Sequence, residues 1–208
     1  MFDYETDDEK VEAIKKWWKE NGVAVIAGAA IGLGSIFAWR AWVGYRSSVE
    51  QQASAVFEQL LVSTDEGDTN SALAQANLLS EEYASTSYAA LAALAQARVE
   101  LQAGRADGAR AALEQVIADS PDPGITRIAA LRLARLMIAE GDLAAATALI
   151  AKYDDGGFSG AFAAVRGDIA QAQGRIADAR AAYEKAIVAG APSPELLRLK
   201  LDNLPPSG

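Results

Sequence analysis

One uncharged segment constrains this chain more than any other feature. Residues 20–42 read ENGVAVIAGAAIGLGSIFAWRAW, with no charged side chain between Glu20 and Arg40. As a helix, the run from Asn21 to Trp39 would rise about 28 Å at about 1.5 Å per residue, close to the roughly 30 Å hydrocarbon thickness of a bilayer. Its large aliphatic and aromatic side chains give a favourable insertion free energy of about −2 to −4 kcal/mol. Length and composition therefore favour a membrane span over a buried helix of a soluble protein.

The flanks of this segment predict that it is a permanent anchor. A cleaved signal peptide needs a short basic start and small residues at a cleavage site. Here the preceding segment is acid-rich, and the apolar run ends in the bulky sequence FAWRAWVGYR. Tryptophans lie on both sides of the run, where amphipathic rings favour the membrane interfaces. These are Trp17, Trp18, Trp39 and Trp42.

The distribution of positive charge predicts the orientation of the anchor. Four lysines precede the span and two arginines follow it, and the positive-inside rule counts Lys and Arg rather than net charge. We therefore expect residues 1–20 to form a cytoplasmic tail with a short interfacial helix near 9–19. A transmembrane helix should occupy 21–43, and a domain at 44–208 should lie on the opposite side of the membrane.

Composition excludes several classes of function. The chain has no cysteine and no histidine, which removes thiol nucleophiles, Ser-His triads and zinc sites built from these residues. The paired carboxylates Asp154 and Asp155 lie in a Gly-rich turn, and no phosphate-binding glycine loop is present. A net charge of −9 gives no general attraction for nucleic acid. We predict no catalytic residue, metal site or cofactor.

Residues after the anchor predict an all-helical domain. They are rich in Ala, Leu, Gln, Glu and Arg and contain no run of alternating β-branched residues. Asp122 and Ser193 each precede a proline, a pattern that predicts a capping side chain at a helix start. The expected helices are the span continued to about 62, then 70–83, 88–103, 106–119, 123–140, 143–153, 159–173, 176–189 and 194–201.

Three glycines mark an internal repeat. Gly104, Gly141 and Gly174 align with spacings of 37 and 33 residues, a period typical of stacked helical hairpins. Five positions after each glycine stands an alanine, followed by a larger residue: Ala109 with Leu113, Ala146 with Ile150, and Ala179 with Tyr183. A small side chain lets two helices approach closely while a large one fills the space beside it. The pattern resembles tetratricopeptide repeats and predicts a solenoid of helical hairpins.

The complete order of segments resembles the YfgM family of ancillary SecYEG translocon subunits. The shared features are the block DEKVEAIKKWWKENG, a Gly-rich span ending in WRAW, a helix opening SSVEQQASAVFEQLL, and hairpins to the end. The resemblance implies a single-pass inner-membrane protein of a Gram-negative bacterium with periplasmic repeats. It further implies association with the translocon, with a membrane-anchored periplasmic chaperone of prolyl-isomerase type, and with exported client proteins.

Two groups of residues are candidates for binding. Small residues at four-residue spacing form two faces of the span, Ala24, Gly28 and Gly32 and then Ala30, Gly34 and Ala38, which would allow close packing against a partner helix. The alternative is that Gly and Ala are simply common in spans. In the repeats, Arg98 and Arg135 occupy one repeat position that faces the concave groove in the tetratricopeptide family, with Gln102 and Gln171 nearby. Such a groove would accept a carboxylate or an extended peptide, whereas the alternative is ordinary solvated arginines.

Two functional hypotheses follow. The first is a non-enzymatic adaptor that is anchored in the membrane and binds the translocon and a chaperone. The second is a structural scaffold that self-assembles through its span and repeats as a homo-oligomer, without a role in secretion.

Overall fold

The computed structural model describes residues 7–154 and 156–205 of the chain. Within these residues all regular elements are α-helices, which confirms the all-helical prediction. The chain divides into two compact units, residues 1–51 and residues 52–208.

The first unit consists of the N-terminal part of α1 (Asp7–Glu66). The expected separate helix at 9–19 is not observed, because α1 continues without interruption into the apolar segment. The residues at the junction explain this continuity: no proline interrupts them, and the side-chain amide of Asn21 donates a hydrogen bond to the carbonyl of Trp17 at 3.1 Å, one turn earlier. Residues 9–19 and the apolar segment are therefore parts of one helix.

Among the described residues, the second unit contains the end of α1 and eight further helices. Each of the eight expected ranges agrees with an observed helix to within about one residue. The helices are α2 (Thr69–Glu82), α3 (Ser87–Gln102), α4 (Ala106–Asp119), α5 (Pro123–Ala139), α6 (Leu143–Tyr153), α7 (Ser159–Ala172), α8 (Ile176–Val188) and α9 (Pro194–Asp202).

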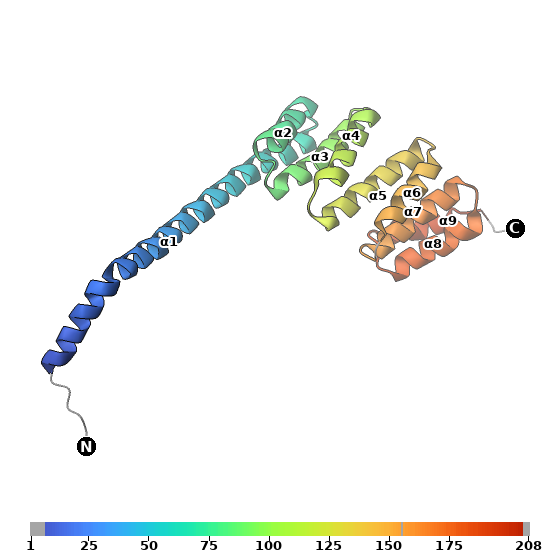
Figure 1. The fold of residues 1–208 in the computed structure, drawn as a ribbon. Coiled ribbons are helices and arrows are strands. Elements are labelled where there is room, and N and C mark those ends of the chain that lie inside the picture. Colours follow the sequence, from blue (N-terminus) through green and yellow to red (C-terminus); the bar gives the residue numbers. More distant parts are fainter. Residues whose placement is uncertain (1–6, 155, 206–208) are drawn as a thin grey trace, which may run out of the picture. The chain divides into compact units, whose positions relative to one another are not determined.

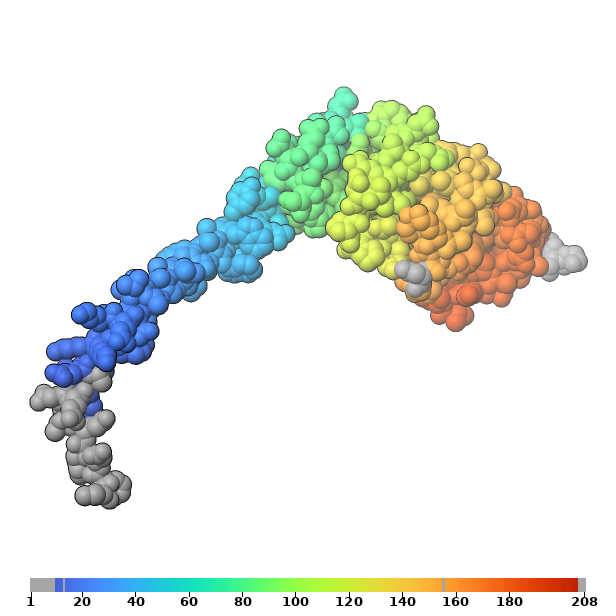
Figure 2. Space-filling view, in the orientation of Figure 1, coloured from blue at the N-terminus to red at the C-terminus, as the bar shows by residue number. Residues whose placement is uncertain are grey.

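These helices stack as hairpins in the order of the sequence. Figure 1 shows α3 beside α4, and α7 beside α8, with α5 and α6 between these pairs. In the space-filling view of Figure 2 the colours of this unit pass in order from the green of α2 to the red of α9, as expected where each hairpin packs mainly on its neighbours. The buried side chains form three successive clusters along this stack, rather than one central core.

The three repeat glycines end the first helix of each hairpin, as predicted. Their φ angles are +74° at Gly104, +84° at Gly141 and +73° at Gly174, a conformation in which a Cβ atom would be strained. In each case the next backbone N–H donates to a carbonyl five residues earlier; from Asp142 to Met137 the distance is 2.9 Å. The same turn therefore joins the two helices of every hairpin.

Packing in the hairpins follows the predicted register. The small residue of each second helix is completely buried, and the larger residue that follows it is at most 3% exposed. These residues are Ala109, Ala146 and Ala179, and Leu113, Ile150 and Tyr183.

One of the two predicted proline-associated caps is wrong. Asp122 caps α5 as expected, since its carboxylate accepts a hydrogen bond from the backbone N–H of Gly124 at 2.7 Å. Ser193 makes no side-chain capping bond at the start of α9. Its φ of +57° is left-handed, whereas a capping residue usually has an extended backbone that directs its side chain at the helix N-terminus.

Candidate functional site

The apolar segment of α1 is not covered by any other part of the chain that the structure describes. Large apolar side chains along it are exposed, including Val23 at 83%, Ile31 at 70% and Phe37 at 70%. By length and composition α1 is the helix of the described chain that could cross a membrane. A core helix of a soluble protein would be mostly buried, so this exposure supports a lipid environment for the segment.

The two small-residue faces of the span are also uncovered. Ala24, Gly28 and Gly32 are exposed, as are Ala30, Gly34 and Ala38. A Cβ atom added at any of the three glycines of these faces would meet no atom within 4 Å. Both faces are thus available for close packing by another helix.

Aromatic pairs lie at both ends of the span. The ring centroids of Trp17 and Trp18 are 6.5 Å apart, and those of Trp39 and Trp42 are 5.2 Å apart. The Arg46 guanidinium lies 5.2 Å from the centroid of the Trp42 ring. A cation over an indole at the end of the apolar run suits the membrane interface, where one side of the ring is apolar and the other is hydrated.

In the second unit, α3, α4 and α5 form a cavity of about 450 Å³ that contains three of the four predicted groove residues. We call it the arginine groove. Its polar side chains are Arg98, Gln102, Arg132 and Arg135, and its apolar lining is Ala97, Leu101, Leu113, Leu136 and Ala139. Arg98 and Arg135, which share a repeat position, lie in the same cavity because equivalent helices stack side by side.

Arg132 is a member of this groove that the sequence analysis missed. One of its terminal guanidinium nitrogens donates a hydrogen bond to the carbonyl of Leu94 at 3.1 Å, which ties α5 to α3. Partial burial lowers the pKa of Arg132, and the positive charges of Arg135 and Arg98 lower it further. The Arg98 side chain has a loose contact with the carboxylate of Asp65 at 3.8 Å, and both partners are exposed. Three cationic groups therefore share a cavity with little compensating negative charge from the described residues.

Gln171 is not part of the arginine groove. Its side-chain oxygen accepts a hydrogen bond from the Tyr183 hydroxyl at 2.7 Å, in the third hairpin. The same hydroxyl contacts the Asp168 carboxylate at 2.8 Å, and Lys200 of α9 forms an ion pair with Asp168. Burial, together with the hydrogen bond to Asp168 and its charge, raises the pKa of Tyr183 well above its ordinary value. Gln171 thus belongs to an internal network that fastens α9 to α7 and α8.

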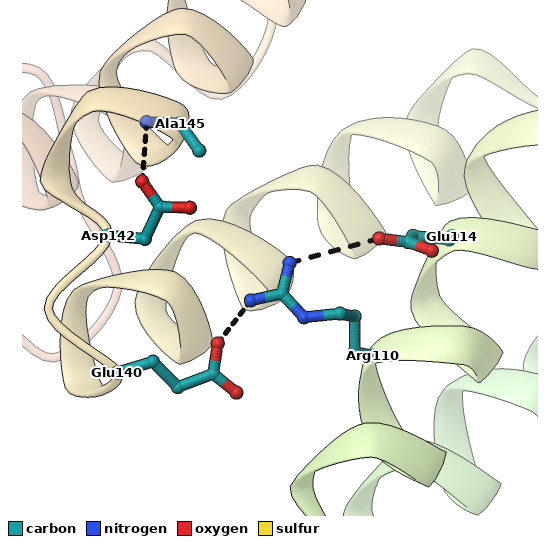
Figure 3. Close-up of polar contacts among 5 residues, drawn as sticks. All are labelled: Arg110, Glu114, Glu140, Asp142 and Ala145. Atoms are coloured by element: carbon teal, nitrogen blue, oxygen red, sulfur yellow. Dashed lines mark hydrogen bonds and ion pairs between the residues drawn. The ribbon is translucent and has the colours of Figure 1, made fainter.

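A second network fixes α4 against α5 beside the groove. Figure 3 shows Arg110 of α4 reaching Glu140 at the end of α5, with Glu114 3.9 Å from a second guanidinium nitrogen. The hydrogen bond to Glu140 raises the pKa of Arg110, and the charges of Glu140, Glu114 and Asp142 act in the same direction against the effect of burial. Asp142 caps α6 by accepting from the N–H of Ala145 at 3.1 Å. These contacts hold the turn between α5 and α6 and thereby the position of α5 in the groove.

Of the paired carboxylates in the Gly-rich turn, Asp154 has a structural partner. Asp154 forms an ion pair with Arg166 of α7, while Asp155 lies outside the described residues. Among the described side chains, no cluster of three or more acidic groups could hold a metal ion.

Comparison with known proteins covers nearly the whole chain. A family model described as "Tetratricopeptide repeat-like domain" matches residues 15–206. A protein of Aggregatibacter actinomycetemcomitans is 31% identical over 199 residues, covering 95% of this chain and 97% of the relative. Relatives in Haemophilus influenzae and Escherichia coli strain K12 are each 29% identical, over 95% and 97% of this chain and 97% and 98% of their own lengths.

All three relatives carry the name "Ancillary SecYEG translocon subunit". No solved structure gives a significant match. The hairpin register, the exposed apolar helix and these matches agree, and the chain belongs to the YfgM family of ancillary SecYEG translocon subunits, with a tetratricopeptide repeat-like domain.

Proposed function

We propose that this protein is a non-enzymatic, membrane-anchored adaptor of the Sec translocon. The main support is the similarity to ancillary translocon subunits over nearly the full length of both chains, which includes the span as well as the repeats. A helix whose apolar surface is left uncovered supplies the means of anchoring.

The two parts of the chain would have different partners. The span would pack against a helix of the translocon through its small-residue faces, because close van der Waals contact drives helix association in lipid. The repeats would lie in the periplasm, where they would bind a membrane-anchored chaperone of prolyl-isomerase type and exported clients. The excess of lysines before the span supports this orientation.

Site-specific photocrosslinking in native membranes would test this assignment. A photoreactive residue at Ile31, which is 70% exposed on the span, should give adducts with translocon subunits. One at Gln102, in the arginine groove, should give adducts with a chaperone or an exported protein. If both positions give only adducts between copies of this chain, the self-assembling scaffold replaces the adaptor.

A matched set of substitutions would test the role of the small-residue face. Replacing Gly28 and Gly32 together by Leu should reduce copurification of the translocon several-fold, because the added side chains keep a partner helix at a distance. Ala29→Leu places a leucine side chain outside both faces and should leave copurification unchanged. Equal retention of the translocon by all variants would show that the span is only a tether.

A further inference from the structure

The arginine groove differs from the equivalent part of the third hairpin in whether the next helix carries a residue of opposite charge. One position of each hairpin lies six residues before the glycine that ends its first helix. The residues at this position are Arg98, Arg135 and Asp168. In the third hairpin the following helix supplies a residue of opposite charge, since Lys200 of α9 pairs with Asp168. In the third hairpin a helix of the same chain, α9, therefore neutralises the charge of Asp168.

The first hairpin has the opposite arrangement. The following helix, α5, brings Arg132 and Arg135 towards Arg98, so the groove gathers charges of the same sign. Arg132 is held by the Leu94 carbonyl, a neutral acceptor. Arg135 is exposed, and no ion pair to it is found among residues 7–154 and 156–205. The chain as a whole has a net charge of −9, but the groove has a local excess of positive charge. Carboxylates of a ligand would neutralise this excess.

The apolar lining adds a second requirement on any ligand. Leu101 is a large apolar side chain that is 46% exposed, while Leu113 and Leu136 are buried beside the cavity. A volume of about 450 Å³ lies within the range of typical ligand pockets. A ligand must therefore present an apolar side chain as well as negative charge.

We propose that the arginine groove binds a segment of a partner protein that carries at least two Asp or Glu side chains beside an apolar residue. Several carboxylates match three guanidinium groups better than the single carboxylate of a chain terminus. Asp65 already provides an example of such a contact at the margin of the groove, 3.8 Å from Arg98. This proposal rests on the adaptor function and names the chemistry of the partner that the repeats would bind.

Peptide titration of the full-length chain in lipid nanodiscs would test the proposal. The probe is a short fluorescent peptide that alternates Glu and Leu, and the reference peptides replace all Glu by Gln or all Leu by Ser. We expect saturable binding of the Glu-Leu peptide that weakens as salt concentration rises, and much weaker binding of both reference peptides. Equal binding of the Gln-Leu peptide, or no binding of the Glu-Leu peptide, would overturn the proposal.

Substitutions in the groove provide the second arm. Arg135→Gln should raise the Kd about tenfold or more, the loss expected for a hydrogen bond to a charged group, while Arg135→Lys should restore part of the affinity. Arg198→Gln removes the same charge from an exposed position on α9 and should leave the Kd unchanged. Circular dichroism checks that each variant remains helical. Equal Kd values for wild type, Arg135→Gln and Arg198→Gln would mean that the groove is not the site.

The same samples distinguish other occupants. If a second copy of the chain fills the groove, the wild type but not Arg135→Gln should sediment as a dimer in detergent, and the partner-segment proposal fails. Copurification with the translocon is measured separately and depends on the span. A negative peptide result would therefore leave the proposed adaptor function intact.

Discussion

Substituting Gly167 by alanine should destabilise the repeat domain although alanine is the better helix former. Gly167 lies in α7, and a Cβ atom at this position would be 2.4 Å from both Cδ1 and Cε1 of Tyr183, where ordinary contacts are 3.4–4 Å. The Tyr183 ring is fully buried, and Asp168 and Gln171 hold its hydroxyl. The ring cannot move aside without losing these hydrogen bonds.

Two opposing effects set the magnitude. Overpacking a rigid core costs about 1–3 kcal/mol, whereas Gly→Ala in a helix interior gains about 1 kcal/mol. Because two ring atoms of Tyr183 would lie at 2.4 Å, the cost should fall in the upper part of its range, which leaves a net loss of about 1–2 kcal/mol in the free energy of unfolding. For a domain of this size that corresponds to a decrease in Tm of about 2–8 °C.

A double-mutant cycle would isolate the contact. In the first hairpin the corresponding residues are Ala97 and Leu113, so leucine in place of Tyr183 should accommodate alanine at 167. Thermal unfolding of the full chain in detergent, followed by far-UV circular dichroism, should show that Gly167→Ala costs less in a Tyr183→Leu background, with a coupling energy of about 1–3 kcal/mol. A penalty that is the same in both backgrounds, or a Gly167→Ala variant that is more stable than wild type, would refute the argument.

The remaining predictions concern packing, pH and topology. Ala179→Leu, at a completely buried position, should lower the free energy of unfolding by about 1–3 kcal/mol, whereas the exposed control Ala177→Leu should change it little; equal effects in urea denaturation would contradict the register. The pKa of Tyr183 is raised in the folded state. The stability that its protonated hydroxyl contributes is therefore fully present below the pKa of about 10 that tyrosine has in the unfolded chain, and is lost as the pH rises above that pKa. Unfolding midpoints should therefore fall more steeply above that pH in the wild type than in Tyr183→Phe, and parallel curves would argue against this role. The native chain has no cysteine, so an impermeant thiol reagent added to intact spheroplasts should label Asn77→Cys but not Glu12→Cys; the reverse pattern would invert the topology.

Much of the fold could be predicted from the sequence because local signals and periodicity specify it. Glycine at positions such as Gly104 and Gly141 is required by a left-handed backbone, and the spacing of these turns sets the hairpins. The alternation of Ala109 with Leu113 predicted which face of α4 is buried. The prediction of a separate helix at 9–19 was wrong, because no cap or proline marks a boundary within α1.

The candidate site was only partly predictable. Arg98 and Arg135 could be placed in one groove because repeat symmetry converts equal sequence position into neighbouring position on stacked helices. Arg132 has no equivalent in that pattern, and its approach to the Leu94 carbonyl depends on how α5 packs on α3. Gln171 resembled a groove residue in sequence, but its side chain is engaged by the Tyr183 hydroxyl.

The sequence by itself determined the elements whose signals are local: the long uncharged run, the hairpin turns, and the small and large positions of each repeat. Only the tertiary structure decided how charges meet between hairpins. Lys200 neutralises Asp168, whereas Arg132 adds to the charge of Arg98 and Arg135. The physical reason is that a side chain's electrostatic environment depends on residues far away in sequence that packing brings within a few ångströms, and no local pattern records which of them will be close.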